Sequence, residues 1–352
     1  MLLKLWAGLL SFLTFFQFSN GPQQPNGIPE TRTAPSNAAE YSIDFSARAK
    51  PWWLSPWLLE QFYQLNVEDG TRTDSLLVLH NGKLVYESYG EGWDAGTLHG
   101  VASVTKTVTS ALVGIAIADG FIKSVDDKLV EYFPDADITI APEWKREITV
   151  EHLLTMTSGF VDDSGVRFAD LLAMGLSGEE KEGIDRRFEE DTIKAGLELC
   201  SMADEPGKRW AYSSFGVDIL LGLVARAIDR PLADYVDEKL FGPLGITHYK
   251  WYTFPDGTYE GSSDLLLTSR DMARFGLLYM NYGRWEDRQI IPADWVAQTP
   301  SRSMNAGAYG RLVWNFKFAP FFGFYEAYGS EGQCIDILPG LGLVLVRTGS
   351  RV

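Results

Sequence analysis

The pattern of apolar and polar positions predicts strands near both ends of the chain and helices between them. An apolar run over 76–80, the pair Asn81-Gly82 and an alternating stretch over 83–89 together predict a β-hairpin. Asparagine and glycine favour it because both adopt the left-handed backbone conformation of a two-residue turn. Three more strands are predicted near the C-terminus, over 313–318, 332–338 and 341–347.

The middle of the chain has the apolar spacing of helices. The longest predicted helix covers 101–120, and small or apolar residues occupy almost every side of it, so it is expected to be buried. Gly120 is expected to end it. Further helices are predicted over 56–65, 148–156, 217–227, 233–241 and 269–282, with short helices in the acidic stretch 161–205.

This order of elements predicts the fold class. Strands come first, helices fill the middle and strands return, which is typical of an α+β protein with one antiparallel sheet built from both chain ends and flanked by helices. We expect a sheet lobe from 48–100 and 310–352, a mostly helical lobe from the residues between, and a cleft where the two meet.

The N-terminal residues differ from the rest of the chain. Lys4 precedes a short apolar run over 5–18, so we interpret 1–20 as a signal peptide or an N-terminal anchor. Residues 21–47 are rich in Pro, Asn, Gln, Ser and Thr and are expected to be a disordered linker, which leaves 48–352 as the domain. The protein is then exported to the periplasm or secreted, and an uncleaved N-terminal segment would tether it to the membrane.

Composition narrows the partners. The net charge of −16, with no basic cluster, argues against nucleic acid. The four histidines and two cysteines have no metal-ligand spacing, so we expect no metal and no cofactor. Cys200 and Cys334 are expected to be free thiols, with a disulfide as the alternative in an oxidising compartment.

The first candidate for chemistry is Ser103-Val104-Thr105-Lys106, at the start of the long buried helix. Serine and lysine three positions apart share a helix face, so their side chains become neighbours. A serine hydroxyl needs a base to become a nucleophile, and a lysine can be that base where burial disfavours its charged form. The alternative is an ordinary N-cap serine beside a solvated lysine.

Two further motifs could complete such a site. Tyr212-Ser213-Ser214 precedes a predicted helix, and a tyrosine there can relay a proton between the serine, the lysine and a leaving group. Gly329-Ser330-Glu331-Gly332-Gln333 leads into a predicted strand, where glycines let the strand edge approach a substrate and donate a backbone N–H to an oxyanion. The alternatives are a tyrosine packed under a loop and a plain β-turn.

In order and spacing these motifs resemble the serine β-lactamase and DD-peptidase superfamily. Within it they are most similar to the class C β-lactamase-like group, which includes the family VIII carboxylesterases and the 6-aminohexanoate-dimer hydrolases. The resemblance runs from Asp74 to Arg347. It is supported by three further stretches, namely 153–159, Pro206-Gly207 and 268–276.

The resemblance implies a role for each motif. Ser103 is the nucleophile, Lys106 the base and Tyr212 the proton relay, and the backbone N–H groups of Ser103 and Gln333 form the oxyanion hole. The family fold usually continues into a C-terminal helix after the last strand. Here the sequence stops at Val352, just after that strand, so either it is truncated or one face of the sheet is less covered than in the family.

The chain departs from the class C lactamases where those enzymes bind the β-lactam. Ser214 stands where they have the Asn of Tyr-x-Asn, and Ser330-Glu331-Gly332 stands where they have Lys-Thr-Gly. We expect Ser214, Ser330, Glu331 and Gly332 to contact substrate instead. Glu331 would either face solvent or disfavour anionic substrates by repulsion.

We therefore expect a serine hydrolase that cleaves an ester or amide bond of a small substrate through an acyl-enzyme on Ser103. One alternative is a DD-peptidase or weak β-lactamase acting on cell-wall peptides or β-lactams. A second alternative is a non-catalytic binding protein that keeps the fold.

Overall fold

The fold is described from a computed structural model, which defines residues 28–33, 71–161, 179–301, 309–318 and 322–351. All structural statements below concern these residues. The helix expected over 56–65, the segment 1–20 and most of the linker 21–47 lie outside them.

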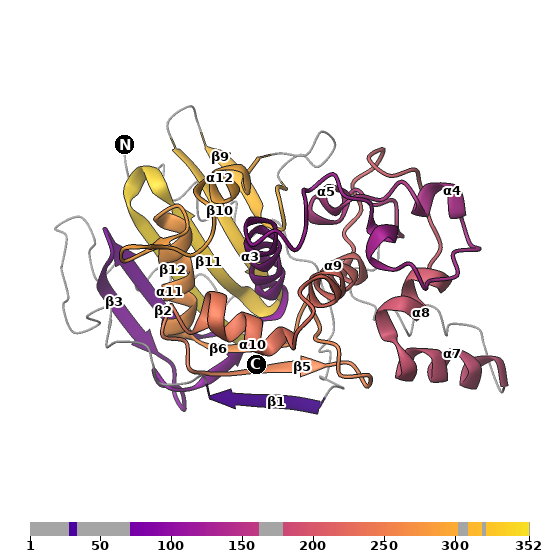
Figure 1. The fold of residues 1–352 in the computed structure, drawn as a ribbon. Helices are drawn as coiled ribbons and strands as arrows, with labels where there is room; N and C mark the ends of the chain where they lie inside the picture. Colours follow the sequence, from indigo (N-terminus) through magenta and orange to yellow (C-terminus); the bar gives the residue numbers. More distant parts are fainter. Residues whose placement is uncertain (1–27, 34–70, 162–178, 302–308, 319–321, 352) are drawn as a thin grey trace.

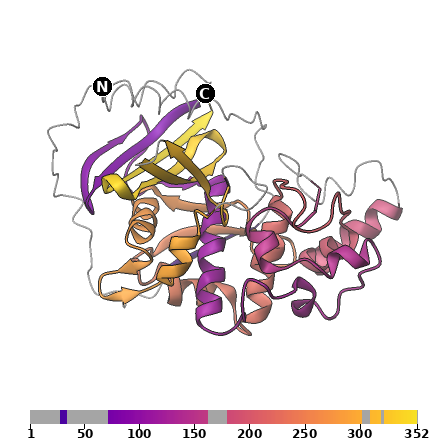
Figure 2. The same ribbon diagram turned by 90° about the horizontal axis from the view of Figure 1, so that it is seen from above.

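A six-stranded antiparallel sheet joins strands from residues 71–89 to the strands at the C-terminal end of the described chain (Figures 1 and 2). β2 (Thr71–His80) and β3 (Lys83–Tyr89) form the predicted hairpin, with φ of 49° at Asn81 and 76° at Gly82. β2 pairs on its other side with the last strand, in the order β3-β2-β12-β11-β10-β9. The C-terminal strands are β9 (Trp314–Phe318), β10 (Phe322–Gly329), β11 (Gln333–Leu338) and β12 (Leu343–Arg351). The predicted α+β class is confirmed.

Helix α11 (Ser269–Met280) lies across this sheet (Figure 1). The contact depends on Gly276, because a Cβ there would lie 2.6 Å from Val344 Cγ1 and 2.7 Å from Ile335 Cγ2. A larger residue would push the helix away from the strands, since protein interiors have no spare volume. α11 therefore belongs with the sheet, although its position in the chain had placed it in the helical lobe.

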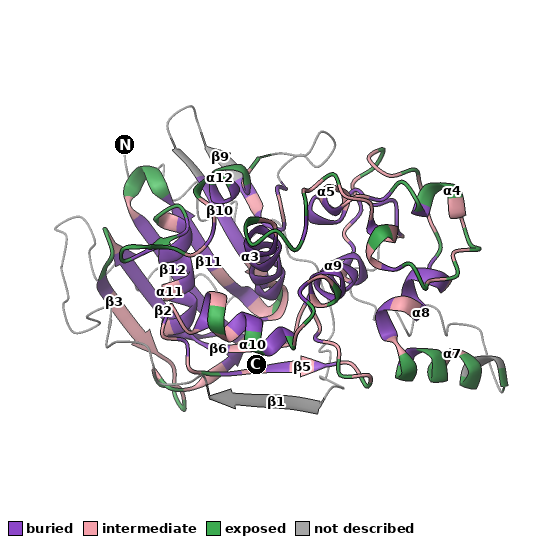
Figure 3. Ribbon diagram, viewed as in Figure 1, coloured by how far each residue is buried: buried purple, intermediate pink, exposed green. Residues whose placement is uncertain are grey.

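Helix α3 (Thr105–Ala118) runs through the centre of the molecule, and every residue from Thr105 to Ala116 is buried, as predicted (Figure 3). The helix does not begin at 101, because a single 3₁₀ turn, η1 (Ala102–Val104), precedes it. The predicted helix over 217–227 begins three residues earlier than expected, as α9 (Ser214–Ala227), and packs beside α3.

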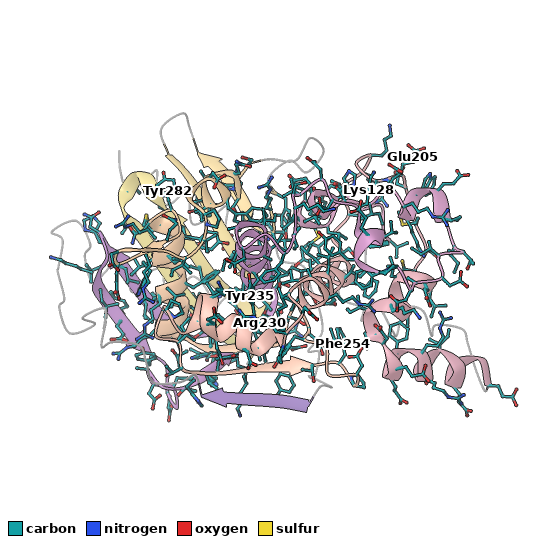
Figure 4. The ribbon with its side chains drawn as sticks, viewed as in Figure 1. Lys128, Glu205, Arg230, Tyr235, Phe254 and Tyr282 are labelled. Atoms are coloured by element: carbon teal, nitrogen blue, oxygen red, sulfur yellow. The ribbon has the colours of Figure 1, made fainter. Side chains whose placement is uncertain are left out.

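Shorter helices surround this pair. They are η2 (Leu129–Tyr132), α4 (Pro142–Lys145), α5 (Val150–Leu154), α7 (Glu179–Glu190), α8 (Thr192–Leu199), α10 (Leu232–Val236) and α12 (Ala293–Gln298). The helix predicted over 233–241 is divided, because α10 continues into a π-helical turn, η3 (Asp237–Phe241). Tyr235 of α10 donates a hydrogen bond of 3.0 Å to Asp119 just after α3, while the Arg230 guanidinium lies over the Tyr235 ring (Figure 4).

A second, four-stranded sheet was not predicted. Its order is β1 (Ile28–Thr33), β5 (His248–Thr253), β6 (Leu265–Thr268) and β4 (Leu98–Gly100). β1 falls inside the stretch expected to be a disordered linker, so that expectation does not hold for these six residues. They pair with the edge of β5, whose unpaired N–H and C=O groups accept an added strand. Two-residue strands β7 (Arg284–Trp285) and β8 (Arg288–Gln289) form a separate hairpin.

Two smaller findings bear on the sequence predictions. Cys200 and Cys334 are free thiols. Among the helices of the described ranges, none is both long enough and apolar enough to cross a membrane.

Candidate active site

Ser103 lies where the second sheet meets the central helix. β4 ends at Gly100, and Val101 N donates to Leu265 O of β6 over 2.9 Å, which anchors the chain just before the serine. Ala102 then adopts a left-handed conformation with φ of 47°, a strained geometry for a residue with a Cβ. The result is a sharp turn that leaves Ser103 half-buried, just before the first residue of the buried helix α3.

Lys106 is held against Ser103. Its Nζ is 3.0 Å from Ser103 Oγ and donates to Ser262 O over 2.8 Å, while the lysine side chain is only 2% exposed. The contacts with Ser103 Oγ and Ser262 O therefore fix the position of Lys106 Nζ inside the protein. The arrangement allows a proton to pass between the serine oxygen and the lysine nitrogen.

The carbonyl that receives Lys106 is itself fixed from behind. Ser262 N donates to Asp218 Oδ1 of α9 over 2.8 Å, and Thr109 of α3 donates to Gly261 O over 2.7 Å. Gly261 has no room for a side chain, since a Cβ would lie 2.6 Å from Leu221 Cβ. This arrangement was not predicted. Its one visible signal in the sequence is Asp218, a lone acid in the otherwise apolar stretch 217–225.

Tyr212 joins the pair from the loop before α9. Lys106 Nζ lies 4.9 Å from the centroid of the Tyr212 ring, a cation–π distance. The loop is set by Ser213, which caps α9 by accepting a 3.1 Å hydrogen bond from Gly216 N. The structure thus brings Ser103, Lys106 and Tyr212 together, while Ser214 is the first residue of α9.

Three more aromatic rings form one cluster with Tyr212. Tyr309 lies 6.4 Å from it and Trp210 6.3 Å from it, measured between ring centroids. Trp314 of β9 packs edge-on against Tyr309 at 4.9 Å and lies 6.1 Å from Trp210. Burial raises the pKa of Tyr309 well above its ordinary value, so its phenol stays neutral. We call Trp210, Tyr212, Tyr309 and Trp314 the aromatic cluster.

The end of strand β10 approaches the backbone of Ser103. A Cβ on Gly329 would lie 3.0 Å from Ser103 N and 2.6 Å from Val101 O, so only glycine fits there. The predicted contact residues Ser330, Glu331 and Gly332 form the tight turn η4 that follows, with φ of 63° at Glu331. Gly329 is therefore the member of the motif that touches the nucleophile's own backbone.

The side chains of Glu331 and Gln333 in this motif have partners of their own. A side-chain oxygen of Glu331 lies 3.4 Å from Arg351 Nε, and the Glu331 side chain is 30% exposed. Gln333 stands opposite Gly329 in the β10–β11 ladder, and its side chain exchanges hydrogen bonds with the backbone of Gly349. The Glu331 charge is thus partly offset by a neighbouring cation.

A second group of ionisable residues lies on neighbouring strands, apart from the serine. Glu326 of β10 faces Asp336 of β11, and their carboxylate oxygens and the Cys334 sulfur lie within 4.8 Å of one another. Burial raises the pKa of Asp336 to about 6 and that of Glu326 well above its ordinary value. Within the described ranges, this is the one group of such donors that could surround a cation. Its carboxyl groups hold protons readily, which weakens them as ligands.

Comparison with known proteins gives a consistent result. A family model described as "Beta-lactamase" matches residues 59–333. "Beta-lactamase-like protein 2" of Dictyostelium discoideum is 25% identical over 258 residues, which are 65% of this chain and 43% of that protein. "Esterase EstB" of Burkholderia gladioli is 32% identical over 155 residues, 43% of this chain and 37% of that protein. The chain thus spans less than half the length of either relative.

A solved structure agrees in fold. A candidate 6-aminohexanoate-dimer hydrolase from Bacillus anthracis superposes with a TM-score of 0.67, covering 99% of this chain and 88% of that one at 21% identity. At that identity the likeness concerns the fold alone.

Proposed function

The chain belongs to the β-lactamase family of serine hydrolases, and from this premise we propose that it cleaves an ester or amide bond of a small substrate through an acyl-enzyme on Ser103. The observation that carries the proposal is the 3.0 Å contact between Lys106 Nζ and Ser103 Oγ, made by a lysine that is 2% exposed. A base confined beside one hydroxyl can take its proton without competition from solvent.

Acylation then follows from the surroundings of Lys106. When the amine is neutral, one N–H is held by Ser262 O, which leaves the lone pair free to receive the Ser103 proton. The serine oxygen attacks the substrate carbonyl, and the carbonyl oxygen becomes an oxyanion. When the oxyanion collapses, the bond from the carbonyl carbon to the leaving group breaks, and Lys106 returns the proton to the leaving atom with the help of Tyr212, whose ring faces it. Water then attacks the acyl-enzyme and gives its proton to Lys106, and the bond to Ser103 Oγ breaks as that proton passes to the serine.

The oxyanion requires backbone donors. Ser103 N is one, because it lies at the start of the helical turn that leads into α3. The second proposed donor is Gln333 N, from the motif over 329–333. Because Gly329 lies so close to Ser103, the N–H of the next residue, Ser330, is another candidate for the second oxyanion donor.

An ester or amide is favoured over a β-lactam for two reasons. Ser214 and the turn Ser330-Glu331-Gly332 replace the Asn and Lys that hold the lactam amide and carboxylate in class C enzymes. A substrate carboxylate would also meet Glu331, a carboxylate only partly offset by Arg351. That one similar protein is named an esterase is consistent with this preference.

The test uses the full chain with a 4-nitrophenyl ester of a short acid and with an active-site phosphonate. We expect steady turnover, covalent phosphonylation of Ser103, and a loss of roughly a thousandfold or more in Ser103→Ala. Ser201→Ala, which alters an exposed serine elsewhere, is the matched control. Unchanged turnover in Ser103→Ala would refute the assignment, and labelling by a fluorescent penicillin in place of ester turnover would favour the DD-peptidase alternative.

A further inference from the structure

The aromatic cluster offers the site more apolar ring surface than the proposed chemistry requires. Tyr309 is only 2% exposed, whereas Trp210, Tyr212 and Trp314 are half-buried and keep part of their surface open. Tyr309 packs against Trp314 at 4.9 Å and against Trp210 at 5.7 Å, both edge-on. A fixed central ring thus supports three partly open ones, one of which contacts Lys106.

We propose that this cluster selects substrates that carry a neutral aromatic group on the leaving alcohol or amine. The inference rests on the proposed function and adds to it the substrate class. Aromatic rings favour edge-on and offset contacts with other rings, beyond what the buried area alone provides. A substrate ring placed against Trp314 and Trp210 would extend the edge-on packing that the cluster already has.

The geometry assigns the cluster to the leaving-group side of the scissile bond. The leaving atom must lie within reach of the group that protonates it, which is Tyr212 together with Lys106. Trp210 and Tyr309 lie 6.3 and 6.4 Å from the Tyr212 ring, and Trp314 packs against both of them, so the cluster is continuous with the group that protonates the leaving atom. The acyl group, on the opposite side of the carbonyl carbon, therefore lies away from the cluster.

The charges nearby favour a neutral group over a cationic one. Lys106 Nζ already occupies one face of the Tyr212 ring, and a second cation there would be repelled. Arg311, which lies between Tyr309 and Trp314 in sequence, directs its guanidinium to Glu151 at 2.9 Å and over the Trp295 ring. The charge of Arg311 is therefore directed away from the cluster and does not draw an anion toward it.

The test compares two esters with the same acyl group and leaving alcohols of nearly equal acidity and size, 2-phenylethyl acetate and 2-cyclohexylethyl acetate. We expect kcat/KM to favour the phenyl ester by roughly two- to tenfold. Trp314→Leu should bring the ratio close to one, and Trp314→Phe should restore part of it. Trp144→Leu, which alters an exposed tryptophan on α4, should keep the native ratio.

A mirrored pair tests the side of the bond. Ethyl 3-phenylpropanoate and ethyl 3-cyclohexylpropanoate carry the same difference on the acyl group, and we expect equal kcat/KM for them. A native ratio of one on the leaving-group side, a ratio unmoved in Trp314→Leu, or a preference only on the acyl side would each overturn the inference. If the native protein turns over none of these esters and the nitrophenyl ester is also inert, the proposed function fails and the inference fails with it.

Discussion

Replacing Asp218 by alanine should slow the reaction, because Asp218 helps to hold Lys106, the proposed base, in position through Ser262. Asp218 Oδ1 accepts from Ser262 N over 2.8 Å, Ser262 O accepts from Lys106 Nζ over 2.8 Å, and that nitrogen is 3.0 Å from Ser103 Oγ. Asp218, Ser262 and Lys106 are 7%, 4% and 2% exposed, so water does not readily replace a missing partner. Asp218 is in this sense a positioning residue, which acts on the reaction through one peptide group.

The magnitude follows from that chain of contacts. A buried N–H that loses its acceptor costs about 1–3 kcal/mol, which should appear as a lower free energy of unfolding. A shift of the Ser262 carbonyl by about 1 Å would misplace the lysine, and displacements of that size cost up to ~100-fold in rate. We expect kcat/KM of Asp218→Ala to fall by roughly ten- to a hundredfold, mainly through kcat, because the substrate does not touch Asp218.

The conservative variant tests the hydrogen bond to Ser262. Asp218→Asn keeps an acceptor oxygen for Ser262 N, so most of kcat should return. Turnover of a nitrophenyl ester, with urea unfolding of the same preparations, measures the rate and the stability of each variant.

Two results would refute the positioning role of Asp218. One is a native kcat/KM in Asp218→Ala, and the other is an Asp218→Asn variant as slow as the alanine variant. Asp126→Ala, which removes an exposed carboxylate in the loop after α3, is the matched control and should change neither the rate nor the stability.

Three further predictions concern strands β10 and β11 and the turn η4 between them. Gly329→Ala should lower kcat at least ~tenfold, because the added Cβ would lie 3.0 Å from Ser103 N. Gly100→Ala, whose Cβ would meet no atom within 4 Å, is the control and should keep the native kcat. Equal ester turnover by the two variants would contradict this prediction. Burial raises the pKa of Asp336 from 3.8 to about 6, so the native state keeps a proton that the unfolded chain loses, and stability should fall as the pH rises from about 4 past 6. Asp336→Asn should therefore raise the free energy of unfolding more at pH 8 than at pH 4 in urea titrations, and an equal effect at both pH values would be evidence against the raised pKa. Glu331→Gln should raise kcat/KM for carboxylate-bearing esters relative to matched neutral esters by only ~threefold, since Arg351 already offsets the Glu331 charge. An unchanged ratio would mean that Glu331 does not face the substrate.

The parts of the fold that could be predicted depend on residues close together in sequence. The β2–β3 hairpin follows from Asn81 and Gly82, whose positive φ values are those that its turn requires. Serine and lysine of the first motif are three positions apart, so one helical turn brings them together whatever the rest of the chain does. The second sheet could not be predicted in the same way. β4 has three residues, too few for a periodic pattern, and β1 acquires its conformation only from the edge of β5.

The two halves of the candidate site differ for the same reason. The base and the nucleophile share one turn, but the carbonyl that holds the base is 156 residues further along the chain. At that distance a sequence shows only an acid in an apolar helix and a glycine in a loop, and each is ordinary by itself. The roles of Asp218 and Gly261 follow only from the packing of α9 against α3. In that packing Gly261 fits against Leu221, and Ser262 N lies 2.8 Å from Asp218 Oδ1. Packing, not local pattern, decides where the proton of Ser103 can go, and so substitutions that disturb Asp218 or Gly261 should slow the reaction although both residues are far from Ser103 in sequence.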